Sequence, residues 1–444
     1  MHVGDRAGYT ESARGNLRFE ASTWLERYRL WLRVKPKGPF MVPPSTYCPR
    51  PRALVYEHEN PPGERLSPKE YGPAGVIDGR NSKGHDKGNN MEPIDSKREG
   101  ISRRTAVKAV AAAVVAGSAP HVHASDKAGS KNAVIGEGAY TYECLHGWGE
   151  VPEHVRWFNT HGVTVDEAGL IYIKHQSAGP TPMDTIVVFD PEGKFVRSFG
   201  KEYHQGGHGI DVRKEGGEEF LYLSDVHHRQ VVKTSLKGDV VWKKSYPKES
   251  GVYQRLEQYR PTNVAFSPDG GFYIGDGYGS NYIHQYDKDA KWVRTWGGTG
   301  EEPGKMKTPH GLWLDNRPGR EPALVVADRA NARLQYFTLD GSFQEIVDGV
   351  SFPAHFDIQG DVLLVPDLHA RVSLFDLKNQ PIAHLGYDPT WTEEVKKFEI
   401  RRDPKRWVAG KFVHPHDACF DADGNIFVVE WVDAGRVTKL RKVT

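Results

Sequence analysis

This sequence has few cysteines, no long apolar run and almost no net charge. Its 444 residues include 3 cysteines, so packing must hold the fold in place of a disulfide framework. The longest apolar stretch, residues 106–116, is shorter than the roughly 18 residues that a membrane-spanning helix needs. The net charge is +1, but residues 1–124 carry 20 Lys and Arg against 13 Asp and Glu, and the remainder carries 39 against 45. The acidic remainder argues against nucleic acid as a partner.

Two of the cysteines, Cys144 and Cys419, lie in the later part of the chain, and Cys48 lies near its start. A bond between Cys144 and Cys419 would tie the beginning of the later part to its end. Two cysteines are too few to decide whether such a bond forms.

An export signal is indicated at residues 91–124. Ser102, Arg103 and Arg104 precede a moderately apolar, alanine-rich run that ends in Val-His-Ala at 122–124. This order resembles a twin-arginine signal with cleavage after Ala124, and it predicts a periplasmic or extracellular protein. An alanine-rich helix inside a domain is the alternative.

The residues ahead of the signal, 1–90, are rich in proline, glycine and charge and have no sustained helix or strand period. Signals rarely stand so far from the start of a chain. We therefore expect translation to begin at Met91 and residues 1–90 to reflect a mis-assigned start, with a disordered tail as the alternative. Neither interpretation gives the segment a chemical role.

From Glu143 onward the sequence repeats one pattern of short strands, Asp-Gly turns and strands that end in aspartate. Six copies begin roughly 45 to 60 residues apart, a period typical of four-stranded propeller blades, at His161, His208, Asn263, His310, His355 and His416. Alternating apolar residues between turns predict strands and leave almost no room for helix. We predict an all-β fold, a six-bladed β-propeller over residues 150–444 after an N-terminal strand or linker over 125–149. The repeats resemble those of NHL-repeat propellers, a resemblance that is specific for fold and not for function.

Histidines at the start of alternate blades predict a metal site on the propeller axis. The innermost strands line the central channel, and equivalent positions in successive blades stand about 60° apart. His208, His310 and His416 begin blades 2, 4 and 6, so they would converge in the manner of a catalytic zinc site with an open fourth position. The alternative is that they are hydrogen-bonded packing residues. The other three blades begin with a poorer metal set, His161, Asn263 and His355.

Two further residues are candidates for chemistry. Tyr278 lies at the loop end of a strand in blade 3, and Arg329 has the corresponding place in blade 4. A metal and a guanidinium nearby would favour the phenolate form of a tyrosine and make it a usable base. Alternatively, Tyr278 is an ordinary aromatic at a blade edge and Arg329 is the partner of Asp328 or Asp276.

Together these motifs resemble the peptidyl-alpha-hydroxyglycine alpha-amidating lyases. The three zinc histidines of that family match "GHGIDV" at His208, "TPHGLWL" at His310 and "HPHDACF" at His416. The resemblance implies that Tyr278 and Arg329 are catalytic. It also implies that Asp417 belongs to a structural calcium site.

The sequence departs from the family pattern at two places. Where the family has an arginine after a histidine in blade 1, this chain has Gln176 after His175, two residues with a weaker claim to substrate binding. Lys174 or Arg260 could supply the missing cation. The family's disulfide beside the tyrosine is also absent, because Gly279 stands where the cysteine would be.

Three functions are compatible with this sequence. The first is a zinc-dependent lyase, expected to be a monomer. It would cleave the C–N bond of an N-acylated alpha-hydroxyglycine, a small-molecule or peptide substrate, to give an amide and glyoxylate. The second is an exported, non-catalytic propeller that binds a protein, peptide or glycan. The third is a metal-dependent lactonase, although such sites are rich in carboxylates and no blade here begins with Asp or Glu.

Overall fold

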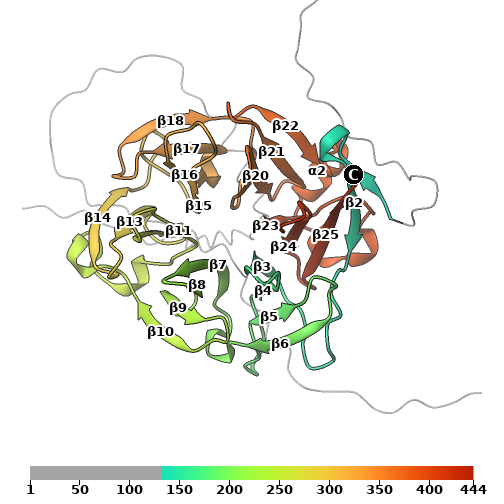
Figure 1. The fold of residues 1–444 in the computed structure, drawn as a ribbon, viewed down its shortest axis with the longest axis horizontal. Coiled ribbons are helices and arrows are strands. Elements are labelled where there is room, and N and C mark those ends of the chain that lie inside the picture. Colours follow the sequence, from blue (N-terminus) through green and yellow to red (C-terminus); the bar gives the residue numbers. More distant parts are fainter. Residues whose placement is uncertain (1–131, 444) are drawn as a thin grey trace, which may run out of the picture. The chain divides into compact units, whose positions relative to one another are not determined.

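The computed structural model describes residues 132–443. The predicted tail (1–90), the predicted export signal (91–124) and residues 125–131 lie outside the described residues. The described part is a six-bladed β-propeller, with six antiparallel sheets arranged around one axis (Figure 1). The predicted all-β propeller is confirmed.

Blades 1 to 5 each have four strands in the order of the sequence, with the first strand innermost. Blades 1 and 2 comprise β3 (Thr160–Val165), β4 (Ile171–His175), β5 (Ile186–Phe189), β6 (Phe195–Phe199), and β7 (Gly207–Glu215), β8 (Glu218–Asp225), β9 (Gln230–Ser235), β10 (Val240–Lys244). Blades 3 and 4 comprise β11 (Val264–Phe266), β12 (Phe272–Gly275), β13 (Tyr282–Tyr286), β14 (Trp292–Gly297), and β15 (Pro309–Asp315), β16 (Ala323–Asp328), β17 (Arg333–Phe337), β18 (Phe343–Val347). Blade 5 comprises β19 (Asp357–Gln359), β20 (Val362–Asp367), β21 (Arg371–Phe375) and β22 (Pro381–Leu385).

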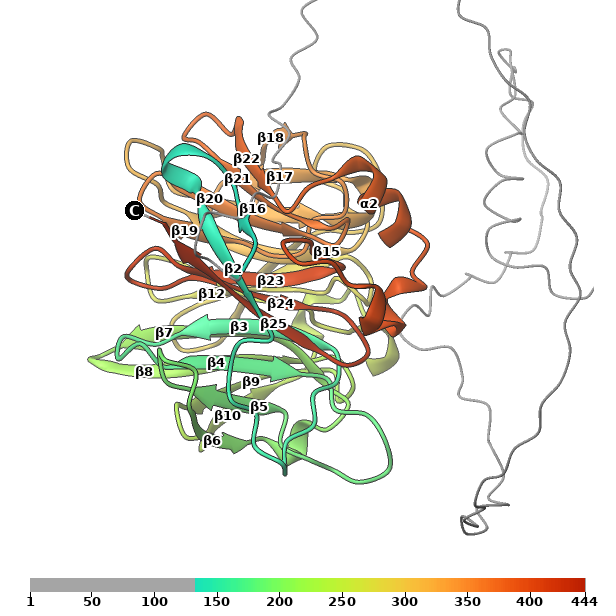
Figure 2. The same cartoon turned by 90° about the vertical axis from the view of Figure 1, so that its right-hand side faces the viewer.

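Blade 6 is built from both ends of the described chain. Its inner strands are β23 (Pro415–Phe420), β24 (Ile426–Glu430) and β25 (Arg436–Lys442), and its outer strands are β2 (Tyr142–His146) and β1 (Val134–Ile135). β2 pairs antiparallel with β25, with Cys144 opposite Leu440, and Figure 2 shows the two strands side by side. The segment predicted as a strand or linker therefore contributes the strands that close the ring.

The blades hold together through apolar side chains on both faces of each sheet. Second strands such as β16 are buried along their whole length, because each lies between two neighbouring blades. One cluster joins Val325 and Tyr336 of blade 4 to Leu363 and Phe375 of blade 5, and similar clusters occur between the other blades. Burying each such side chain stabilises the fold by about 1.5–3 kcal/mol.

Helix is rare but not absent. The connection from β22 to β23 contains α2 (Pro389–Val395), where the carboxylate of Asp388 accepts a hydrogen bond from the Trp391 N–H at 2.9 Å and Pro389 occupies the first turn. These are strong signals for a helix start, and the repeat pattern, which does not extend into this connection, gave no hint of them. Short 3-10 turns are η1 (Gly138–Tyr140), η2 (Lys201–Tyr203), η3 (Lys248–Ser250), η4 (Leu256–Gln258), η5 (Arg329–Asn331), η6 (Ile400–Arg402) and η7 (Pro404–Arg406).

This topology brings two kinds of segment to one mouth of the channel. The chain enters each innermost strand at that mouth, and because the strands are antiparallel, the loop between the second and third strands of every blade returns to it. The starts of β7, β15 and β23 therefore share this end with the loops that carry Tyr278, Arg329 and Gln176.

The predicted blade starts were wrong by one residue in blades 3 and 5. The Nδ1 atoms of His208 and His310 contact the carbonyl oxygens of Thr262 and Ala354 in the next blade, and His416 makes the same contact with His161. Thr262 and Ala354 are thus the equivalents of the histidines, while Asn263 and His355 lie one residue further along their strands. Successive side chains of a strand point to opposite faces, so His355 points away from His208, His310 and His416.

Two further expectations concern cysteine and the surface. Cys144 and Cys419 are both buried free thiols in separate apolar clusters, so the bond that the sequence left open is absent.

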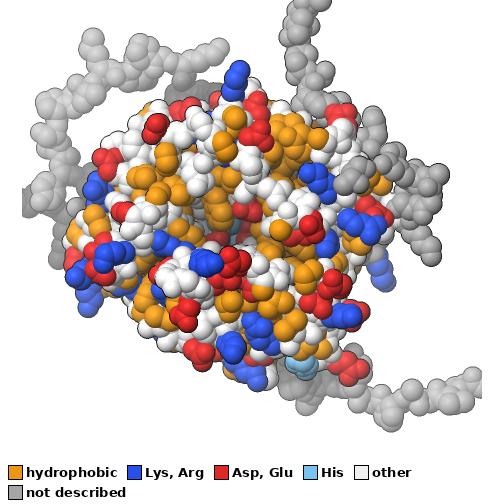
Figure 3. Space-filling model, in the orientation of Figure 1, with side chains coloured by type: hydrophobic (Ala, Val, Ile, Leu, Met, Phe, Trp, Pro, Cys, Tyr) orange, Lys and Arg blue, Asp and Glu red, His pale blue; other side chains and the backbone are white. Residues whose placement is uncertain are grey.

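On the face in Figure 3, acidic and basic side chains are interspersed, and the surface is hollowed at the centre of the ring. Within residues 132–443, no helix has the length and apolar character to cross a membrane.

Candidate metal centre

Three buried histidines converge on the axis as predicted. His208, His310 and His416 are the second residues of β7, β15 and β23, and one potential ligand atom from each lies within 4.8 Å of the other two. The Nε2 atoms of His208 and His310 are 3.1 Å apart. The ring centroids of the three are 4.6 to 4.9 Å apart.

Backbone carbonyls fix the tautomer of each ring. Each Nδ1 lies 2.7 Å from a carbonyl oxygen of the next blade. A carbonyl can only accept, so each Nδ1 carries the hydrogen and each Nε2 presents a bare lone pair. The Nε2 of His416 is buried without a hydrogen-bond partner among the described residues. Three converging lone pairs repel one another unless a positive charge lies among them, so this donor set fits a metal ion.

Burial keeps the three imidazoles neutral, which is the form that binds metal. It lowers the pKa of His208, His310 and His416 well below the usual value of 6.5. The Arg329 guanidinium adds to this effect, since a nearby positive charge opposes protonation.

Tyr278 and Arg329 lie at the same centre. The Tyr278 hydroxyl donates to the His310 Nε2 at 2.9 Å and lies 3.4 Å from the His208 Nε2. Arg329 is 4% exposed, donates from Nη1 to the Tyr278 hydroxyl at 3.1 Å and from Nε to the Pro353 carbonyl at 3.1 Å. The tyrosine oxygen is thus held between two imidazoles and a guanidinium.

The loop that carries Tyr278 is fixed by a buried carboxylate. Asp276 accepts from the Arg260 and Ser280 backbone N–H groups at 2.6 Å each and from the Tyr253 hydroxyl at 2.8 Å. Burial raises the pKa of Asp276 to about 7, against these donors. A side chain at Gly279 would overlap the Asp276 carboxylate and the Gln258 carbonyl. These contacts fix the backbone on both sides of Tyr278.

His175 and Gln176 lie at the mouth, but their polar atoms have protein partners. His175 lies opposite Thr160 in the pairing of β4 with β3. In blade 4 the corresponding position, opposite Pro309, is occupied by the acidic residue Asp328. Its Nε2 donates to the Asp184 carbonyl at 2.9 Å, and its Nδ1 lies 3.5 Å from the Phe158 N–H. The Gln176 amide donates to the Gln205 carbonyl at 3.1 Å.

Lys174, one candidate for the missing cation, is directed between blades. Its side chain is buried, and its Nζ donates to the Ser224 carbonyl at 2.6 Å. Burial lowers the pKa of Lys174 to about 7. The other candidate, Arg260, lies beside the tyrosine loop, where its carbonyl accepts from the Tyr278 N–H at 3.3 Å.

Asp417 lies beyond the histidines, in an acidic part of the channel. It lines a cavity of about 380 Å³ together with Asp211, Asp357 and His355. Burial raises the pKa of Asp417 to about 8, and one Asp211 oxygen is buried without a hydrogen-bond partner. Carboxylate oxygens are the donors that calcium prefers, so the set fits a hard cation. His355 competes for this role, because Asp417 and Asp211 outweigh the effect of burial and raise its pKa to about 9.

Two further buried histidines are His161, which the sequence placed in the poorer metal set, and His414, which it did not single out. The His161 ring lies 4.5 Å from that of His416, and His414 is buried two residues before His416 in the chain. The motif "THG" at 160–162, which parallels "GHG" and "PHG" in blades 2 and 4, was the signal for His161. His161 was grouped with Asn263 and His355 because the three begin the alternate blades 1, 3 and 5.

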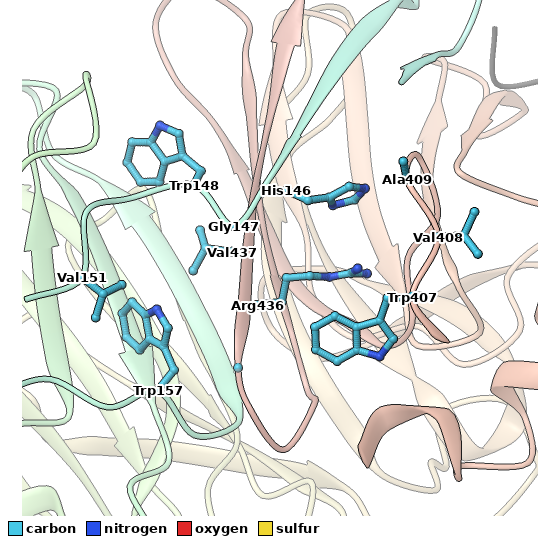
Figure 4. Close-up of a pocket in the computed structure, with 11 residues that line it drawn as sticks. His146, Gly147, Trp148, Val151, Trp157, Trp407, Val408, Ala409, Arg436 and Val437 are labelled. Carbon is cyan, nitrogen blue, oxygen red and sulfur yellow. The ribbon is translucent and has the colours of Figure 1, made fainter. Parts of the chain in front are cut away.

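A second cavity, of about 480 Å³, lies against blade 6 and the segment that leads into blade 1. Figure 4 shows Trp148 and Trp157 on one side of it and Trp407 on the other. The Arg436 guanidinium lies 4.6 Å from the Trp407 ring centre and is paired with Glu430. None of the three metal-site histidines lines this cavity.

Fold and site together define a six-bladed propeller with an axial three-histidine centre. The chain is 27% identical over 283 residues to peptidyl-alpha-hydroxyglycine alpha-amidating lyase 1 of Drosophila melanogaster, covering 59% of this chain and 49% of the fly protein. It is 31% identical over 266 residues to the peptidylglycine alpha-amidating monooxygenase of Rattus norvegicus, covering 57% of this chain and 26% of the rat protein. The match thus spans about half of the fly protein and a quarter of the rat protein. The chain is a propeller that resembles the alpha-amidating lyases.

No protein-family model matches the sequence. Among solved structures, a gluconolactonase of Xanthomonas campestris is similar with 11% identity and a TM-score of 0.48, covering 73% of this chain and 95% of the other. At these values the likeness gives no information about the chemistry of the site.

Proposed function

We propose that this protein is a metal-dependent lyase that cleaves the C–N bond of N-acylated alpha-hydroxyglycines to give an amide and glyoxylate. The observation that carries the proposal is the convergence of three bare imidazole Nε2 atoms with a tyrosine hydroxyl 2.9 Å from one of them. The names of the curated relatives support the same reaction class. Zinc is the metal that we propose, because it accepts three nitrogen ligands and keeps a position for substrate.

In this proposal the residues of the chain divide the work. His208, His310 and His416 would hold the metal, which when bound supplies positive charge that makes the substrate hydroxyl more acidic. Tyr278, as the phenolate, takes the hydroxyl proton, and the O–H electron pair becomes the second C–O bond. The C–N pair leaves with the amide nitrogen, which takes up that proton from Tyr278. Arg329 holds the Tyr278 oxygen at 3.1 Å and favours its anionic form by its charge.

The direct test is glyoxylate release from N-benzoyl-alpha-hydroxyglycine. The full chain is stripped with a chelator and assayed before and after addition of one equivalent of zinc. We expect release only after zinc is added. Absence of release from protein shown to hold one metal per chain would refute the lyase activity.

A second candidate is a propeller that binds a ligand without chemistry. The tryptophan-lined cavity of about 480 Å³ favours it, since apolar, aromatic-lined cavities of this size are typical binding sites. A chain that holds metal and releases no glyoxylate would support this candidate.

We also propose that calcium binds at Asp417 and stabilises the fold. A cation there would offset the charge of the buried Asp211 and Asp417 carboxylates and of the half-buried Asp357. Millimolar calcium should raise the melting temperature of the wild-type chain, and Asp417→Asn should abolish this increase. An equal increase in both proteins would contradict the site.

A further inference from the structure

A fourth histidine, His161, adjoins the metal centre. Its side chain is 1% exposed. Its ring centroid is 4.5 Å from that of His416 and 5.3 Å from that of His208, which is comparable to the spacing within the trio. His161 therefore belongs to the immediate surroundings of any molecule bound at the centre.

The hydrogen bonds of His161 leave it with a bare acceptor. Its Nδ1 lies 2.9 Å from the carbonyl oxygen of Asn159, so Nδ1 carries the hydrogen. Its Nε2 is buried and has no hydrogen-bond partner among the described residues. Burial lowers the pKa of His161 to about 3, so the ring is neutral. A buried acceptor without a partner costs free energy that a bound donor can recover.

His161 is not arranged as a fourth member of the trio. The Nδ1 atoms of His208, His310 and His416 donate to backbone carbonyls of the next blade. The Nδ1 of His161 instead donates to the carbonyl of Asn159, two residues earlier in the sequence. This turns the ring differently, and the group of ligand atoms within 4.8 Å of one another comprises His208, His310 and His416. A bare nitrogen beside the metal position and outside the ligand set is suited to contact a substrate.

The chemistry of the proposed substrate selects the group that His161 can bind. An N-acyl-alpha-hydroxyglycine has two hydrogen-bond donors, its hydroxyl and its amide N–H, and its carboxylate would be repelled by a lone pair. Tyr278 contacts His208 and His310, whereas His161 contacts His208 and His416. With the hydroxyl at Tyr278, the amide N–H is the donor that remains for the other side of the centre.

We propose that the Nε2 of His161 accepts a hydrogen bond from the N–H of the scissile amide, so that the site selects secondary amides over N-alkylated ones. This inference rests on the proposed function, because it takes its substrate class from there. It makes His161 a residue that positions the C–N bond and sets specificity, and it involves no change of protonation.

The test compares two unreactive analogues that differ by one methyl group. N-benzoylglycine has the amide N–H, and N-benzoyl-N-methylglycine lacks it. Their binding to the zinc-loaded full chain is measured by calorimetry for the wild type, His161→Leu, which removes the acceptor, and His161→Gln, which offers an amide oxygen in its place. His384→Ala, a buried histidine in the outermost strand of blade 5, is the matched control, and metal content is measured for each protein.

We expect the wild type and His384→Ala to bind N-benzoylglycine about tenfold more tightly than the methylated analogue, the worth of one buried hydrogen bond. His161→Leu should lose this preference and His161→Gln should recover part of it, with metal content unchanged. Equal preference in the wild type and His161→Leu, or binding of neither analogue by the wild type, would overturn the inference. Glyoxylate release by the wild type decides the proposed function separately.

Discussion

Three backbone carbonyls determine what His208, His310 and His416 can do. By accepting from each Nδ1, they orient every Nε2 toward the axis and ensure that it is unprotonated. The carbonyls belong to Thr262, Ala354 and His161, whose side chains take no part in these bonds. The rings are therefore arranged as ligands by the main chain, before any metal arrives.

Replacing His310 with alanine should abolish stoichiometric metal binding. The two remaining imidazoles leave the metal with fewer than the three protein ligands that a catalytic zinc site uses. Metal per chain, measured by mass spectrometry after dialysis against a trace of zinc, should fall from about one to near zero. His154→Ala, at an exposed position, should keep its metal, and a His310→Ala protein that still holds one equivalent would contradict the site.

Replacing Tyr278 with phenylalanine should remove the proton acceptor and spare the metal. The ring remains, so packing is preserved, while general base catalysis typically contributes 10² to 10⁴-fold. We expect kcat for glyoxylate release to fall by about that factor, with one metal per chain retained. Unchanged turnover would refute the role of Tyr278.

Among the structural elements, the loop between β12 and β13 shows how this chain supports its site without a disulfide. Asp276 collects three donors from Arg260, Ser280 and Tyr253. The close approach of the loop backbone requires glycine at position 279. The tyrosine is thus positioned by a buried hydrogen-bond network, which is sensitive to small changes of volume.

Replacing Gly279 with alanine should displace this loop. The added methyl group would overlap the Asp276 carboxylate, and such overpacking costs about 1–3 kcal/mol. We expect a lower kcat and a lower melting temperature with normal metal content. Gly319→Ala is the control for kcat: an added methyl group there meets nothing within 4 Å, although the φ of +80° strains any side chain. It should keep the wild-type kcat even where its melting temperature falls.

The repeat made the blades predictable from the sequence, but not the details between them. Histidines at a regular spacing could be assigned to alternate blades, because each blade contributes one equivalent position. The one-residue offset at Asn263 and His355 arose because threonine and alanine occupy the equivalent positions there and carry no recognisable signal. The hydrogen bonds of the Nδ1 atoms could not be predicted, since their acceptors are backbone groups of neighbouring blades. The helix α2 was missed because the repeat pattern does not extend into its connection, although Asp388 and Pro389 are local signals for a helix start. The position of His161 depends on His208 and His416 in the two neighbouring blades.

At the scale of the whole molecule, the ring is closed by β1 and β2. They cover the edge of β25 and bury Ile135, Tyr142 and Cys144 between blades 5 and 6. Without them the last blade would keep three strands, with an unpaired edge and an exposed apolar face. Stability therefore depends on a segment that lies outside the six complete repeats.

Deleting residues 1–146 should destabilise the propeller far more than deleting residues 1–131. The longer deletion removes both closing strands, and the loss of three buried side chains alone costs on the order of 5 kcal/mol. We expect a clearly lower melting temperature or insoluble protein. The chain that begins at residue 132 is the matched control, and equal melting temperatures would show that the closing strands are dispensable.

The pairing of β2 with β25 also sets an order of events during synthesis. The strand that seals the ring is made first, and its partner, Arg436–Lys442, is made last. The circle cannot close before residues 436–442 have emerged from the ribosome, because β2 pairs with them. Until then the blades already made form an open arc. All three histidines can enclose a metal only after β23, which carries His416, has joined the first five blades.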